Sequence, residues 1–270
     1  MIVFPHAKIN LGLQILDRRA DGFHNLETIF YPVKWNDALE LILDPTLNQI
    51  HFSSSGLTID AAAADNLCVR AYQLIKTDFP ALSGIRCWLH KTIPSGAGLG
   101  GGSSDAAFML KAIRQLALPS LSDEALHAYA LQLGSDVPYF LLNTPAVATG
   151  RGENLTACSI DLTDYHLVIV HPGIHVHTGR AFATLSSNRT YTPVEEALTK
   201  PLHTWKDCLF NHFEASVFNT HPEIGAIKQQ LYDAGALYAS LSGSGSSVYG
   251  LFEQKPKTLL FPTHYAIHNG

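Results

Sequence analysis

A glycine-rich stretch, IPSGAGLGGGSSDAA at residues 93–107, limits the folds open to this chain more than any other feature. It follows a segment at 85–91 whose alternating apolar residues predict a strand, and it precedes a segment at 103–118 whose apolar residues recur at helical spacing. Such a loop leaves backbone N–H groups free to converge on an anion, and the N-terminus of the next helix adds partial positive charge. The order strand, glycine loop, helix therefore predicts a phosphate-binding loop and argues against a flexible linker.

Two well-known phosphate motifs fit this loop poorly. The Walker A pattern requires a lysine after its second glycine, whereas Gly102 is followed by serine. The dinucleotide fingerprint G-x-G-x-x-G does match from Gly96 to Gly101. The acidic residues near the required distance, Asp123 and Glu124, open a predicted helix instead of ending a strand. A dehydrogenase is therefore the weakest of the functions considered.

Composition restricts the class of protein. The chain has 270 residues, of which 46% are hydrophobic and 15% are charged, so we expect a globular protein with one large domain or two modest ones. The formal net charge of -5 argues against bulk attraction to nucleic acid or to an anionic membrane. The four cysteines form no CxxC pair, and we see no signal peptide and no apolar stretch long enough to cross a bilayer. These features predict a soluble, cytoplasmic protein with free thiols.

The rest of the chain reads as alternating strands and helices. Asp65 is the expected N-cap of a helix over 65–79, and Ser122 and Gly134 are the expected ends of another. Residues 147–155 read as a loop, with a domain boundary near residue 150. The remaining expected elements are strands at 7–16, 26–33, 38–44 and 165–173, a helix at 221–235, and two strands around a glycine turn within 236–252.

The glycine loop, with Pro94 before it and small residues after it, resembles the central signature of the GHMP kinase superfamily. Three further segments narrow the resemblance to one of its families, the 4-diphosphocytidyl-2-C-methylerythritol kinases of the non-mevalonate isoprenoid pathway. They are PHAKINLGLQILDRRADGFHNLETIF at 5–30, LGSDVPYF at 133–140 and SLSGSGSSVYGLF at 240–252. Together with the loop they span nearly the whole chain.

The resemblance implies an α+β two-domain GHMP kinase fold. Its N-terminal domain, expected at residues 1–150, is similar to the second domain of ribosomal protein S5, and its C-terminal domain, expected at 151–270, is ferredoxin-like. The implied activity is the ATP- and Mg²⁺-dependent phosphorylation of the 2-hydroxyl of 4-(cytidine 5′-diphospho)-2-C-methyl-D-erythritol, in the cleft between the domains. The expected partners are these small molecules, without nucleic acid or membrane, and the expected state is a monomer or weak homodimer.

The family's two catalytic residues map onto Lys8 and Asp136. Lys8 interrupts an alternating apolar strand, and without the resemblance it would be an edge-strand lysine pointing to solvent. Asp136 precedes Pro138 and could equally be a helix N-cap. By resemblance, Asp136 is the general base, and the Lys8 ammonium keeps it ionised and stabilises the developing alkoxide.

The resemblance also supplies binding residues for ATP. Asn66 and Lys91 are expected near the nucleotide, with a capping asparagine and a solvated lysine as open alternatives. The serines that follow the loop offer hydroxyls to phosphate oxygens or to Mg²⁺, and an expected role as caps of the helix is compatible with that binding; the ligands of the metal are not assigned. The loop residues expected to contact the triphosphate are Pro94, Ser95, Gly96, Ala97, Gly98, Leu99, Gly100, Gly101, Gly102, Ser103 and Ser104.

A cytosine-binding site is implied in the same way. Phe23 and Phe182 would stack on the two faces of the base, and His24 would hydrogen-bond its edge. Asn10 and Thr178 would hold the remainder of the substrate. The family often has tyrosine where this chain has Phe23; without the resemblance both phenylalanines would be assigned to the core.

Other functions stay open at this point. A GHMP kinase for another alcohol, such as homoserine, fits the loop but not the RADGFH segment. A non-catalytic ATP-binding sensor needs neither Lys8 nor Asp136. His171, His175 and His177 lie close together in the sequence, but without a further ligand pattern they are better explained as partly exposed residues than as a metal site.

Overall fold

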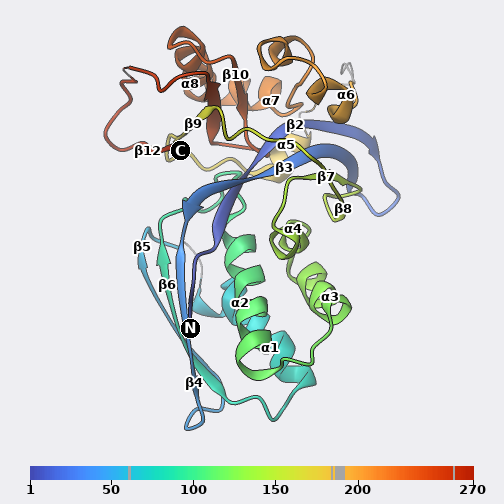
Figure 1. The fold of residues 1–270 in the computed structure, drawn as a ribbon, viewed down its shortest axis with the longest axis vertical. Helices are drawn as coiled ribbons and strands as arrows, with labels where there is room; N and C mark the ends of the chain where they lie inside the picture. The colour runs from blue at the N-terminus through green and yellow to red at the C-terminus, as the bar shows by residue number, and fades with distance from the viewer. Residues whose placement is uncertain (60–61, 184, 186–191, 258) are drawn as a thin grey trace. The chain divides into compact units, whose positions relative to one another are not determined.

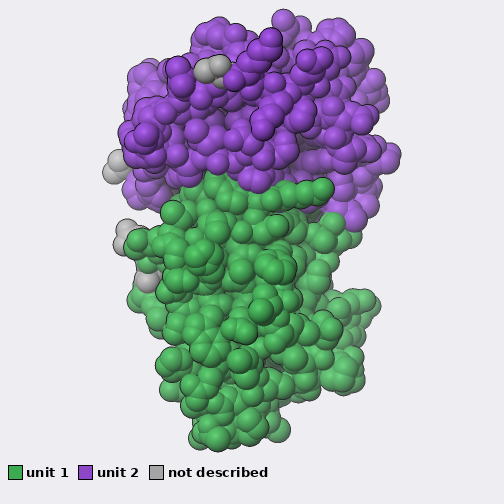
Figure 2. All heavy atoms as spheres, turned by 60° about the vertical axis from the view of Figure 1, so that its left-hand side comes forward, with its two compact units in different colours: residues 1–7, 34–95, 100–143 green, residues 8–33, 96–99, 144–270 purple. Residues whose placement is uncertain are grey.

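The computed structural model describes all residues except 60–61, 184, 186–191 and 258 (Figure 1). The chain divides into two compact units, coloured separately in Figure 2. The first comprises residues 1–7, 34–95 and 100–143, and the second comprises residues 8–33, 96–99 and 144–270. These units differ from two continuous segments that meet near residue 150, because an N-terminal segment and part of the glycine loop group with the C-terminal residues.

A four-stranded sheet, with the order β1-β4-β6-β5, forms one layer of the first unit. Its strands β4 and β6 are antiparallel. Strands β5 and β6 are parallel, which requires a crossover connection, and the segment between them contains α1. Figure 1 shows the helices α1, α2 and α3 packed together beside this sheet. The bounds are β1 Ile2–Val3, β4 Ala38–Asp44, β5 Ile50–Gly56, η1 Ala63–Asp65, α1 Leu67–Asp78, β6 Gly84–Lys91, α2 Gly101–Ala117, α3 Asp123–Leu133 and α4 Val137–Leu142.

The helix ends of this unit follow local sequence, with one correction. Ser122 caps α3 by accepting a hydrogen bond from the Ala125 backbone at 3.2 Å, and Gly134 follows the last turn, as expected. The expectation that Asp65 caps α1 is wrong, because Asp65 is the last residue of a short 3₁₀ helix. Asn66 is the cap instead, and its side chain accepts from the Cys68 N–H at 2.9 Å.

The second unit holds two four-stranded sheets, with the orders β2-β3-β7-β8 and β10-β11-β9-β12. The expected loop at 147–155 is largely a hairpin of β7 and β8, whose turn contains Gly150 at φ 70° and Gly152 at φ 107°. Two glycines in the left-handed region allow the chain to reverse within four residues. The strand bounds are β2 His6–Arg18, β3 His24–Asn36, β7 Ala146–Thr149, β8 Asn154–Ala157, β9 His166–His171, β10 Tyr238–Leu241, β11 Val248–Phe252 and β12 Ala266–Asn269.

Helices of this unit pack against its second sheet around an apolar core that includes Val168, Ile224 and Leu241. The helix expected at 221–235 is α8, which begins at Pro222, and the two strands expected around the glycine turn are β10 and β11. The remaining bounds are α5 Thr178–Ala183, α6 Val194–Leu198, η2 Leu202–Asp207, α7 Glu214–Thr220 and α8 Pro222–Asp233. Among the residues described, none of the helices combines the length and the hydropathy that a bilayer-spanning helix requires.

Candidate functional site

Lys8 is a buried residue of β2. Its side chain is 3% exposed, so the alternative of a solvent-facing edge lysine is wrong. The Lys8 ammonium donates to Asn10 Oδ1 at 2.6 Å and lies 4.8 Å from the centre of the Phe30 ring. The Asn10 amide in turn donates to Thr28 Oγ1 at 3.0 Å. These contacts give the buried ammonium a fixed direction, and they bring together two residues expected at the site, Lys8 and Asn10.

The middle of the glycine loop is held inside the second unit. The Lys8 backbone N–H donates to Leu99 O at 2.9 Å, so β2 and the loop are hydrogen-bonded directly. On the other side, Ser242 Oγ donates to Gly98 O at 2.8 Å, and the Ser247 N–H donates to Ala97 O at 3.1 Å. The serine- and glycine-rich segment at 242–247, called the third glycine motif below, therefore braces the loop. Only the fold reveals this contact between distant segments.

Glycine is needed in this loop for two separate reasons. Gly96, Gly98 and Gly100 have φ values of 67°, 79° and 70°, in the left-handed region that side chains other than glycine rarely adopt. A Cβ atom on Gly98 would also lie 2.0 Å from Ser242 O, inside the contact distance of the backbone. The loop therefore keeps its shape only without side chains at these positions.

The helix after the loop, α2, begins at Gly101, two residues earlier than expected. Its N-cap is Gly100, so the serines lie in the first turn and the expectation that they also cap the helix is wrong. Ser103 is half-buried, while Ser104 is buried and its Oγ has no hydrogen-bond partner among the described residues. An orphaned hydroxyl in the first turn of the helix leaves a polar group for a ligand to satisfy.

Lys91 lies at the end of β6, just before the loop. It is 2% exposed, and its ammonium contacts the carboxylates of Asp37 and Asp105, the latter at 2.8 Å. The alternative of a solvated lysine is therefore wrong, while the expected approach to the nucleotide stays a prediction. Neither Asp37 nor Asp105 is an expected site residue: Asp37 belongs to no motif, and Asp105 lies within the glycine-rich stretch but beyond the glycines and serines expected to contact phosphate.

Asp136 lies in the first unit between α3 and α4. Its backbone occupies the N-cap position of α4, but its side chain makes no capping hydrogen bond. N-capping therefore does not explain why a carboxylate stands at this position. Asn66, by contrast, does cap α1, which supports the structural alternative for that residue and leaves a contact with adenine as a prediction.

A cavity of about 690 Å³ in the second unit gathers most of the expected substrate residues. It is lined by Arg18, Gly22, Phe23, His24, Thr178, Gly179 and Phe182. Thr178 Oγ1 lies 2.8 Å from Ser244 Oγ, which links this cavity to the third glycine motif. The sequence segment RADGFH and the start of α5, far apart along the chain, thus meet at one cavity of the size of a small-molecule site.

The rings of this cavity do not lie as expected for a base held between two phenylalanines. His24 stacks on Phe182, with centroids 4.9 Å apart and planes at 14°, so its ring covers a face instead of presenting an edge. Phe23 is 52% exposed and therefore not a core residue. The Arg151 guanidinium lies 4.2 Å from the centre of the Phe23 ring. Arg151 lies in the turn between β7 and β8, and no sequence motif marks it as a site residue.

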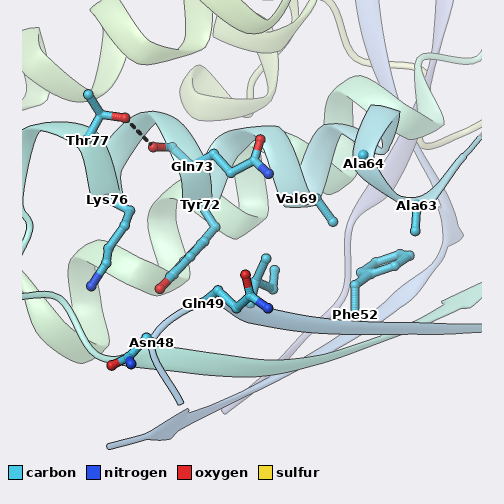
Figure 3. Close-up of a pocket in the computed structure, with 11 residues that line it drawn as sticks. Asn48, Gln49, Phe52, Ala63, Ala64, Val69, Tyr72, Gln73, Lys76 and Thr77 are labelled. Carbon is cyan, nitrogen blue, oxygen red and sulfur yellow. Dashed lines mark hydrogen bonds between the residues drawn. The ribbon is translucent and has the colours of Figure 1, made fainter.

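A second cavity, of about 430 Å³, lies in the first unit between α1 and β5 (Figure 3). None of the expected site residues lines it. Its one lysine, Lys76, donates to the backbone oxygens of Pro80 and Leu82, so the ammonium is occupied by the protein itself. The other polar side chains in Figure 3 are neutral amides and hydroxyls, which do not form a phosphate site.

The three histidines of the HPGIHVH segment have different surroundings. His171 is buried, so the expectation of a partly exposed residue is wrong for it, and its Nδ1 lies 3.1 Å from Ser246 Oγ in the third glycine motif. Burial lowers the pKa of His171 to about 4, so its imidazole is neutral near pH 7. The rings of His175 and His177 contact each other edge to face, with their centroids 4.7 Å apart. Within the described residues, no three histidines, cysteines or carboxylates gather as metal ligands.

Comparison with known proteins agrees with this arrangement. The family of GHMP kinase N-terminal domains matches residues 66–144, and the family of GHMP kinase C-terminal domains matches residues 191–260. The 4-diphosphocytidyl-2-C-methyl-D-erythritol kinase of Bacteroides thetaiotaomicron is 48% identical over 254 residues, which cover 94% of this chain and 92% of that protein.

Solved structures show the same relationship. A crystal structure of 4-(cytidine 5′-diphospho)-2C-methyl-D-erythritol kinase matches with a TM-score of 0.79 at 34% identity, covering 93% of this chain and 90% of that one. A homoserine kinase from Cytophaga hutchinsonii matches with a TM-score of 0.69 at 18% identity, covering 93% and 86%. The second likeness concerns the fold alone, so homoserine is not favoured as substrate, and the kinase families replace the dehydrogenase interpretation. The chain therefore belongs to the 4-diphosphocytidyl-2-C-methyl-D-erythritol kinase family of GHMP kinases.

Proposed function

We propose that this protein transfers the γ-phosphoryl group of ATP to the 2-hydroxyl of 4-(cytidine 5′-diphospho)-2-C-methyl-D-erythritol. The observation that carries the proposal is the cavity of the second unit, where Phe23, His24, Thr178 and Phe182 come together in a chain that belongs to this kinase family. Two aromatic rings, an imidazole and a hydroxyl suit a pyrimidine, which offers a face for stacking and a polar edge for hydrogen bonds.

Phosphoryl transfer depends mainly on positioning and on charge stabilisation. We assign the triphosphate to the glycine loop, whose left-handed glycines and lack of side chains leave its backbone open to an anion. The N-terminus of α2, a helix of 17 residues, adds partial positive charge at the end of the loop. Asn66 and Lys91 are retained as proposed neighbours of the nucleotide.

The proton of the 2-hydroxyl is assigned to Asp136, whose carboxylate is not used to cap its helix. Lys8 is assigned to stabilise negative charge that develops on the acceptor oxygen. Its support is the buried ammonium, held by Asn10 and placed on the strand that hydrogen-bonds Leu99 of the loop. Burial strengthens such a charge interaction, because little water is present to screen it.

Kinases of this kind use Mg²⁺, which neutralises charge on the phosphates. The metal takes oxygen ligands, and it commonly binds through substrate phosphates, water and one or two protein groups. The residues present fit that pattern, since Ser104 carries a buried hydroxyl without a partner among the described residues and Ser103 lies beside it in the first turn of α2. We propose these two hydroxyls as the protein's contribution near the metal or the phosphates.

An ADP-release assay tests the proposal. The protein with ATP and Mg²⁺ is expected to release ADP when the cytidine diphosphate methylerythritol substrate is added, and to release little when homoserine or galactose replaces it. Comparable kcat/KM values for homoserine would contradict the assigned substrate while leaving the kinase fold in place.

A further inference from the structure

Three charged side chains are buried together where the glycine loop begins. Lys91 ends β6, Asp37 lies in the turn before β4, and Asp105 lies just after the first turn of α2. The Lys91 ammonium donates to Asp105 Oδ2 at 2.8 Å and to Asp37 Oδ2. The side chains are 2%, 0% and 4% exposed for Lys91, Asp37 and Asp105. The cluster therefore joins three separate elements of the first unit through one ammonium.

Asp37 also holds the first residues of the loop. Its second oxygen, Oδ1, accepts hydrogen bonds from the backbone N–H groups of Thr92 at 2.6 Å and Ile93 at 2.9 Å. One carboxylate thus binds the last side chain of β6 and the two residues that follow. On the other side of the cluster, a Cβ atom on Gly101 would lie 2.9 Å from the Lys91 Nζ. The ammonium packs closely under the start of α2.

Stability alone is a poor explanation for this cluster. Desolvating three charges costs free energy that their attraction repays only with good geometry, and apolar residues of similar volume often serve stability as well or better. One ammonium also serves two carboxyl groups, and Asp105 Oδ1 is buried without a hydrogen-bond partner among the described residues. What the cluster supplies is a fixed geometry between the end of β6, the loop and the N-terminal part of α2.

We propose that Asp37, Lys91 and Asp105 are positioning residues for the nucleotide, which fix the entrance of the glycine loop relative to the helix that follows it. The inference rests on the proposed function, in which the triphosphate binds to this loop. A shift of the Thr92 and Ile93 backbone displaces the first N–H groups of the loop relative to residues 97–99, which are held by separate hydrogen bonds to Lys8, Ser242 and Ser247. Nucleotide affinity therefore depends on Asp37, a residue that does not itself contact ATP in this account.

Asp37→Asn tests the proposal, with Asp44→Asn as the matched control. Asp37 directly precedes β4, and Asp44 is the last residue of that strand. Like Asp37, Asp44 accepts hydrogen bonds from a backbone N–H, that of Thr46, and from a cation, Arg86 Nε at 2.7 Å. Asp44 lies at the end of β4 away from the loop. Hydrogen exchange of the ligand-free proteins is measured first; exchange at Thr92 and Ile93 is expected to quicken in Asp37→Asn and not in Asp44→Asn.

Kinetics of the same variants complete the test. Asp37→Asn is expected to raise the KM for ATP on the order of 10-fold, the effect of a weakened charge-assisted hydrogen bond, and to leave the KM for the cytidine substrate unchanged. Asp44→Asn is expected to change neither KM. The proposal is overturned if exchange at the loop entrance is unaffected, if the KM for ATP stays at the wild-type value, or if both KM values rise together.

A third variant separates this proposal from the proposed function. Gly100→Val places a branched side chain at a left-handed position of the loop. If Gly100→Val abolishes ATP binding while Asp37→Asn does not weaken it, the nucleotide site stands and the positioning role is wrong. If Gly100→Val leaves ATP affinity unchanged in a folded protein, the nucleotide lies elsewhere, and the assignment of the loop fails before the role of Asp37.

Discussion

His24 lies parallel to Phe182, with ring centroids 4.9 Å apart and planes at 14°. Both rings line the cavity assigned to the cytidine group, so His24 occupies one face of the ring on which the base is expected to stack. Two π-systems cannot share one face, and a base that stacks there has to displace the imidazole. The expected hydrogen bond from His24 to the edge of the base therefore requires His24 to leave Phe182 when substrate binds.

Phe182→Ala tests this pocket. Removing one stacking face is expected to weaken the binding of the cytidine substrate by about 5- to 150-fold, the range for a stacked base, and to leave the KM for ATP unchanged. His24→Ala is expected to weaken the same substrate and to reduce discrimination against a uridine analogue. In wild-type protein, the His24 ring protons, shifted upfield by Phe182, are expected to move downfield when substrate is added in an NMR titration. Equal losses for ATP and the cytidine substrate, or none for either, would place the cytosine site elsewhere.

Asp136→Asn tests the proposed base. The amide cannot accept the hydroxyl proton, so kcat is expected to fall about 10²- to 10⁴-fold. ATP binding is expected to persist, because the glycine loop is unchanged. The free energy of unfolding of the variant is measured beside that of the wild type, so that a loss of turnover is not mistaken for a loss of fold. Steady-state kinetics, ATP titration and urea unfolding check these outcomes; turnover near the wild-type value removes Asp136 from the mechanism.

Gly98→Ala tests the brace between the glycine loop and the third glycine motif. Its added Cβ atom would lie 2.0 Å from Ser242 O, so the loop has to move away from the motif, and ATP binding is expected to be lost or strongly weakened. Gly235→Ala is the matched control, because Gly235 also has a positive φ, 96°, but nothing lies within 4 Å of a Cβ there. That variant is expected to lose some stability through backbone strain and to bind ATP normally. Equal ATP affinity in both variants contradicts the brace.

The buried charge cluster predicts a dependence of stability on pH. Burial raises the pKa of the Asp105 carboxyl from 3.8 to about 7, although the Lys91 ammonium lowers it. Between about pH 4 and about pH 7, Asp105 holds a proton in the folded chain that it has released in the unfolded chain. The free energy of unfolding therefore falls as the pH rises through this window. The other groups that face the cluster, the Cys68 and Cys87 thiols, stay protonated there because burial raises their pKa values.

Asp105→Asn is the variant that checks this dependence. An amide has no proton to release, so the fall in unfolding free energy between about pH 4 and about pH 7 is expected to be smaller in the variant than in the wild type. Urea unfolding across this window measures it. Identical pH profiles for the two proteins would show that Asp105 ionises in the folded state at its ordinary pKa.

Local patterns predicted much of the fold. Apolar alternation predicts the strand before the glycine loop, Ser122 and Gly134 mark the ends of α3, and the order strand, glycine loop, helix is present as expected. The resemblance to a kinase family is confirmed by full-length relatives. The sequence predicts a loop where β7 and β8 form a hairpin, because glycines dominate a short segment there and two strands of four residues carry little pattern.

Contacts between distant segments could not be predicted in the same way. Asp37 reads as an ordinary turn residue until β4 and β6 pair, which brings it to Lys91 and to the loop entrance. Arg151 reads as a turn arginine until β7 joins β3 and the turn approaches Phe23. The division of the chain is likewise tertiary, since residues 8–33 group with the C-terminal residues. A monomer or weak homodimer stays a prediction.

The most direct test of the account is a phosphorus NMR measurement of the product. The protein is incubated with ATP, Mg²⁺ and 4-(cytidine 5′-diphospho)-2-C-methyl-D-erythritol, with homoserine and galactose in parallel reactions. The account predicts a new phosphomonoester resonance together with those of ADP in the first reaction, an unchanged cytidine diphosphate linkage, and no such product in the other two. ATP that stays intact with the cytidine substrate, or a phosphomonoester formed from homoserine or galactose instead, would contradict it.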